Sequence, residues 1–111
     1  MRELEYQITV QDESGLPVTK KVRGYLAFVM FGFVFGVHHE TDGTIWGSFD
    51  DWVITELSTG MCLTFNSPTF TKEQAIERGV KFLNKKGKKA TEQAVAKRLE
   101  FLSKPIALTA I

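Results

Sequence analysis

The chain contains very little cysteine. Cys62 is the single cysteine among 111 residues, which excludes an intramolecular disulfide and a cysteine-rich zinc site. Because disulfides belong to oxidising compartments, this composition favours the cytoplasm. The segment from Met1 to Tyr6 carries two glutamates and no apolar run, so it does not predict a secretory signal.

A long apolar run is missing as well. The stretch from Gly24 to Val37 is uncharged over 14 residues, whereas a membrane-spanning helix needs ~20. It also carries three glycines and aromatic residues at strand-like spacing. We therefore expect strand structure here and no membrane partner.

Motifs for nucleophilic catalysis are absent from the sequence. No glycine-rich phosphate-binding loop occurs, and Cys62 lies in an alternating segment without a basic neighbour to activate its thiol. No serine has the glycine setting of a nucleophile elbow, including Ser48, Ser58 and Ser67. We expect that the protein is not an enzyme.

Acidic residues and histidines gather in the middle of the chain, but their spacing predicts neither a metal site nor a catalytic acid–base pair. In the segment His38-His39-Glu40-x-Asp42 the two histidines are adjacent, so on a strand they point to opposite faces and cannot easily share one metal ion. Asp50 and Asp51, even with Glu56 nearby, lack the contrasting environments that separate a catalytic acid from a base. We expect no metal centre and no cofactor.

The first third of the chain predicts strands. Apolar and polar residues alternate from Glu3 to Val10, which is typical of a half-buried strand. The turn residues between Asp12 and Pro17 predict an antiparallel hairpin. The stretch Val22 to Met30 fits a strand or a helix, and we favour a strand that continues through Phe31 to Val37. The glycines on one face of that strand indicate a closely packed helix or a bulge.

The middle of the chain predicts a hairpin followed by a helix. Trp52 to Leu57 and Met61 to Phe65 alternate, and Gly60 suits the left-handed position of the loop between them. Thr71 and Gln74 then form a capping-box pattern that begins an amphipathic helix. Gly87 marks the end of this helix.

A second helix is expected over residues 91–103, with Pro105 as its stop. Beyond it, Ile106, Leu108 and Ala110 alternate with other residues. This pattern indicates a short edge strand or a contact with a partner, including a second copy of the chain. Together the patterns predict one α+β domain over residues 1–111. It has an antiparallel sheet of about four strands within residues 1–66, packed by a helix at about 72–84, and a second short helix at about 91–103.

Charge is divided unevenly along the chain. Residues 1–80 hold six basic and eleven acidic side chains, and residues 81–111 hold eight basic and two acidic ones, giving net charges of −5 and +6. The basic C-terminal set is the candidate binding site for an acidic partner or for nucleic acid: Lys81, Lys85, Lys86, Lys88, Lys89, Lys97, Arg98 and Lys104.

Two segments carry a resemblance to a known class of proteins. The patterns are Trp52-x-Ile54-Thr55-x-x-x-Thr59-Gly60-x-x-Leu63 and Thr71-x-x-x-Ala75-Ile76, within about a third of the chain. They resemble small phage and prophage accessory proteins of sheet-then-helix design. The resemblance implies an accessory protein of a mobile element, a class that includes inhibitors of host defence. It does not assign a function to any residue of this chain.

We therefore expect a non-enzymatic protein that binds a host protein or nucleoprotein in the host cytoplasm by charge complementarity. A nucleic-acid-binding module using the basic residues is the first alternative. A phage structural or assembly protein, forming homo-oligomers through the apolar tail, is the second.

Overall fold

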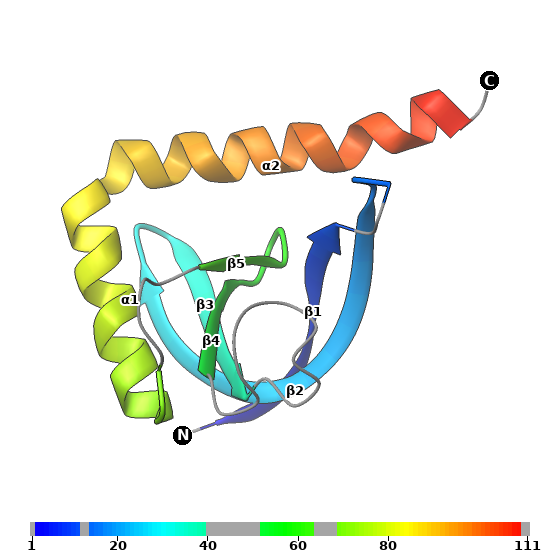
Figure 1. Cartoon of the computed structure of the whole chain (residues 1–111). Helices are drawn as coiled ribbons and strands as arrows, with labels where there is room; N and C mark the ends of the chain where they lie inside the picture. The colour runs from blue at the N-terminus through cyan, green and yellow to red at the C-terminus, as the bar shows by residue number, and fades with distance from the viewer. Residues whose placement is uncertain (1, 12–13, 40–51, 64–68, 110–111) are drawn as a thin grey trace.

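The structure is a computed structural model that describes residues 2–11, 14–39, 52–63 and 69–109, with side chains left undescribed at residues 10, 11, 101 and 103–109. The described residues form one antiparallel sheet in the order β1-β2-β3-β4-β5, followed by two helices (Figure 1). The predicted α+β class is confirmed. The elements are β1 (Glu3–Gln11), β2 (Pro17–Met30), β3 (Phe33–His39), β4 (Trp52–Glu56), β5 (Met61–Leu63), α1 (Lys72–Lys86) and α2 (Lys88–Thr109).

Strand β2 organises the sheet because it is long enough to serve two neighbours. Its first part pairs with β1 and its second part pairs with β3, with a register shift between Leu26 and Phe28. Such a bulge bends a strand and increases its twist, and β2 is visibly curved (Figure 1). The ambiguous stretch Val22 to Met30 is therefore strand.

A tight turn at Phe31 and Gly32 separates β2 from β3, so the predicted continuous strand through Phe31 is wrong at this point. Both residues have positive φ, 57° and 84°, as in the two-residue hairpin loops that match the twist of a sheet. Met30 and Phe33 pair directly across the turn. This hairpin makes five strands in the described residues instead of about four.

The sheet curls until its two ends meet. The backbone N–H of Thr9 on β1 donates to the carbonyl of Gly60 at 2.8 Å, and the Thr9 hydroxyl donates to the carbonyl of Thr59 at 2.9 Å. Inside the curl, a Cβ on Gly36 would lie 2.9 Å from the Tyr6 ring. The bare glycine on β3 therefore makes room for a tyrosine, and the expected close approach of a helix at this position is wrong.

Helix α1 covers the outer face of β3 and β4 (Figure 1). The buried core between them contains Phe35, Val37, Ile54, Ala75 and Leu83. The predicted helix start is confirmed, because the Thr71 hydroxyl accepts a hydrogen bond from the backbone of Gln74 at 3.0 Å. At the other end Gly87, with φ of 90°, donates its N–H to the carbonyl of Leu83 at 2.8 Å, which is the expected C-terminal glycine.

Helix α2 differs from the prediction at both ends. It begins at Lys88, directly after Gly87, and runs for 22 residues to Thr109, so the expected short helix over residues 91–103 is wrong in length. The expected stop at Pro105 is wrong, because this residue lies inside α2, although an interior proline costs the helix one ladder hydrogen bond. Ile106 and Leu108 lie in this helix and not in an edge strand, whereas Ala110 lies outside the described residues.

Candidate functional site

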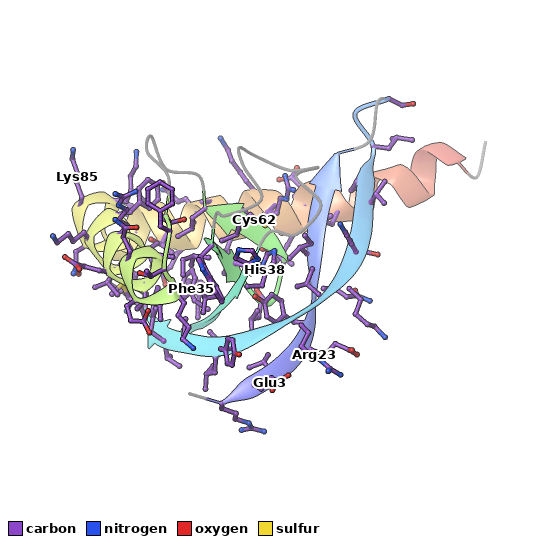
Figure 2. All side chains as sticks on the ribbon, turned by 60° about the horizontal axis from the view of Figure 1, so that its bottom comes forward. Glu3, Arg23, Phe35, His38, Cys62 and Lys85 are labelled. Atoms are coloured by element: carbon purple, nitrogen blue, oxygen red, sulfur yellow. The ribbon has the colours of Figure 1, made fainter. Side chains whose placement is uncertain are left out.

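Four lysines gather where the two helices meet. Gly87 joins α1 to α2, and Lys85, Lys86, Lys88 and Lys89 lie on either side of it with exposed side chains. We call these four residues the lysine corner. The lysines that end α1 also interact favourably with the negative end of the helix dipole. Figure 2 shows Lys85 projecting from α1 away from the sheet.

The other members of the predicted basic site do not all join this cluster. Lys81 on α1 pairs with Glu77 at 3.0 Å, and Lys97 is exposed further along α2. Arg98 points toward the sheet, where its Nη2 donates to the carbonyl of Thr9 at 3.3 Å. The backbone of Lys104 belongs to α2, and its side chain is outside the described set. The structure therefore brings four of the eight predicted residues into one cluster and uses Arg98 to attach α2 to β1.

The positive charge of the lysine corner is exposed to solvent. Among the side chains that the structure describes, no carboxylate forms an ion pair with any of its four lysines. The Lys86 ammonium lies 5.7 Å from the centroid of the Phe82 ring. Exposed charges on neighbouring positions attract an acidic partner over about a Debye length, ~8 Å at physiological salt.

A cavity of about 390 Å³ adjoins this corner. It lies between β5 and the two helices, and most of its wall is apolar. Lys86 belongs to its lining, so one lysine of the corner reaches the cavity. Sequence reasoning missed this cavity because its walls come from strands and helices that are far apart in the chain.

Glu56 has a structural role that the sequence did not reveal. Its carboxylate is 1% exposed and accepts hydrogen bonds from the residues that follow it. The Ser58 backbone and hydroxyl donate at 2.8 and 2.7 Å, and the Thr59 hydroxyl donates at 2.8 Å. Glu56 therefore closes the turn between β4 and β5. The other acidic residues considered as a site, Glu40, Asp42, Asp50 and Asp51, lie outside the described residues.

The two histidines point to opposite faces of β3, as predicted. His38 is 2% exposed, and its Nδ1 lies 3.2 Å from the Tyr6 hydroxyl. His39 packs edge-on against Trp52, with ring centroids 5.1 Å apart. Within the described ranges, no three histidine, cysteine, aspartate or glutamate side chains gather as a metal site.

Cys62 lies on β5 with a half-buried side chain, and its Sγ is 3.4 Å from the Thr55 hydroxyl. In the part of the chain that the structure describes, neither helix has the length and hydropathy of a membrane span. No family model matches the chain, and no curated protein or solved structure is significantly similar to it. The resemblance to phage accessory proteins therefore stays a prediction.

Proposed function

We propose that the chain is a non-enzymatic binding protein that docks through the lysine corner onto an acidic surface of a host protein or nucleoprotein. The observation that carries this proposal is the lysine corner itself, four exposed cations without a paired carboxylate among the described residues. In this proposal the protein acts in the host cytoplasm as a phage-encoded inhibitor of host defence.

A rigid support strengthens the proposal. Helix α1 is anchored by Ala75 and Leu83 in the core, and α2 is anchored by buried Val95 and by the bond from Arg98 to Thr9. Cations held on packed helices lose little further freedom on binding, which lowers the entropic cost of association. Complementary charge then raises the association rate and favours acidic partners.

Nucleic acid is the second candidate, favoured by the spacing of two lysines. Lys89 and Lys97 are eight residues apart and both exposed on α2, so they are separated by about 12 Å along the helix axis and by about 80° around it. A row of cations of this kind can follow a phosphate backbone. Against it, Arg98 is turned toward the sheet, which removes the basic residue that binds phosphate most specifically.

A neutralised variant tests the proposal. Lys85, Lys86, Lys88 and Lys89 are replaced by Gln in one chain, and the matched control carries Lys21→Gln and Arg23→Gln, two exposed bases on β2. Each protein is immobilised and exposed to a bacterial lysate with and without nuclease, and the retained proteins are identified by mass spectrometry.

The expected result is a protein retained by the wild type and by the control after nuclease treatment, and lost by the neutralised variant. Retention that disappears with nuclease in every sample identifies nucleic acid as the ligand. Gel shifts of a DNA duplex at low and high salt check that outcome, because phosphate binding weakens steeply with salt. Equal retention by all three proteins contradicts a role for the lysine corner.

A further inference from the structure

The cavity beside the lysine corner has a mostly apolar wall. Its wall includes Phe35 and Leu63 from the sheet, Phe82 and Leu83 from α1, and Val95 from α2. A volume of about 390 Å³ lies at the lower end of the range for ligand pockets, about 300–1,000 Å³. It therefore has room for a large apolar side chain.

Two charged side chains line the cavity, Glu56 and Lys86. The buried Glu56 carboxylate already accepts hydrogen bonds from Ser58 and Thr59. It therefore needs no hydrogen bond from a ligand, and its negative charge disfavours an anion inside the cavity. Lys86 also lines the cavity and belongs to the cationic lysine corner. An occupant that matches both features has an apolar group inside the cavity and negative charge outside it, next to the lysine corner.

We infer that the cavity receives one large apolar side chain of an acidic segment in the partner protein, while flanking carboxylates of that segment contact the lysine corner. This inference rests on the proposed docking function and names the partner's chemistry. A single carboxylate ligand would need one lysine, whereas the corner offers four. A side chain buried in a pocket, with a polar rim around it, is the usual arrangement at the centre of an interface.

Two synthetic peptides test the inference. The first is a fluorescein-labelled heptapeptide with Phe at its centre and three acidic residues on each side, and the second has Ser at the centre. Burying a phenylalanine side chain predicts that the Phe peptide binds the wild type at least about tenfold more tightly. Fluorescence anisotropy measures both affinities.

A filled cavity is the decisive variant. Ala94 is an exposed residue of α2 that lines the cavity, so Ala94→Phe occupies the cavity without breaking the core. Ala96→Phe, also exposed on α2, is the matched control. The tenfold preference for Phe should vanish in Ala94→Phe and persist in Ala96→Phe.

The cysteine gives an independent readout. Cys62 lies in the cavity wall, so the Phe peptide should slow its reaction with Ellman's reagent, whereas the Ser peptide at equal occupancy should not. A Phe preference that survives in Ala94→Phe, or an unprotected Cys62, overturns the inference.

The peptides also separate this inference from the docking proposal. Equal binding of both peptides that is lost in the neutralised variant overturns the cavity inference and supports the lysine corner. Cavity-dependent binding that is unchanged in the neutralised variant overturns the role of the corner and the acidic character of the partner. Failure of both peptides to bind overturns both.

Discussion

The Tyr6 hydroxyl and the His38 imidazole meet inside the curled sheet, with the oxygen 3.2 Å from Nδ1 although the residues are 32 positions apart. Their rings are nearly perpendicular, with centroids 5.9 Å apart. Burial lowers the pKa of His38 from 6.5 to about 4, and the nearby charges of Lys20 and His39 act in the same direction. Burial also raises the pKa of Tyr6. The histidine is therefore neutral at physiological pH.

The lowered pKa of His38 predicts a loss of stability in mild acid. Between pH 6.5 and pH 4 the unfolded chain binds a proton at His38 that the folded chain does not, so the free energy of unfolding falls as pH falls through this window. The expected loss between pH 7 and pH 5 is about 2 kcal/mol. Urea unfolding at both pH values should show a much smaller loss in His38→Gln. His39→Gln removes only the smallest of the three causes of the lowered pKa, so it should keep most of the loss. Equal losses in wild type and His38→Gln would contradict the prediction.

Gly60 is predicted to be far less replaceable than Gly15. Both have positive φ, 72° and 81°, but a Cβ on Gly60 would lie 2.6 Å from the Thr9 hydroxyl, whereas one on Gly15 would meet nothing within 4 Å. Gly15→Ala should therefore lower the free energy of unfolding by about 1 kcal/mol, the cost of holding an alanine at positive φ. Gly60→Ala should cost at least about 2 kcal/mol more, because the junction of β1 with the β4–β5 turn must open. Urea midpoints of the two variants measure the difference, and equal values would disprove the contact.

Glu56→Gln should destabilise the protein by about 2 kcal/mol. The buried carboxylate accepts several hydrogen bonds, whereas the glutamine amide would direct its NH₂ group, a donor, at some of the same donating groups. Glu5→Gln is the matched control. Glu5 is 52% exposed and lies 3.6 Å from Lys21, so its loss should change the free energy of unfolding by less than about 1 kcal/mol. Chemical denaturation compares the two. A cost for Glu56→Gln no larger than that of Glu5→Gln would show that the turn does not depend on the carboxylate.

Arg98→Ala should loosen α2 from the sheet, because the guanidinium bond to the Thr9 carbonyl is lost. The expected cost is about 1–2 kcal/mol, with faster hydrogen exchange of backbone amides in α2. The neighbouring Lys97→Ala removes an exposed side chain and should leave both quantities nearly unchanged. Hydrogen exchange read by mass spectrometry reports on α2 directly, and identical protection in the two variants would rule out this anchor.

The predicted binding site shows how far sequence reasoning reaches. The charge division and the cluster around Gly87 follow from residues that are close in the chain, so the lysine corner was predictable. The inward turn of Arg98 was not, because its acceptor on Thr9 lies 89 residues away. The cavity was hidden for the same reason, since Phe35 and Val95 share a wall without any local pattern that relates them.

The sequence by itself determined the elements whose signals are local: the alternating strand β1, the capped start of α1 at Thr71 and its end at Gly87. These depend on periodicity and on hydrogen bonds between near neighbours. The tertiary structure alone decided the turn at Phe31, the buried role of Glu56 and the meeting of Thr9 with Gly60. Phe31 packs against the core, Glu56 is buried beside the two helices, and Thr9 bonds to Gly60. Each of these features depends on segments that meet only when the chain has folded.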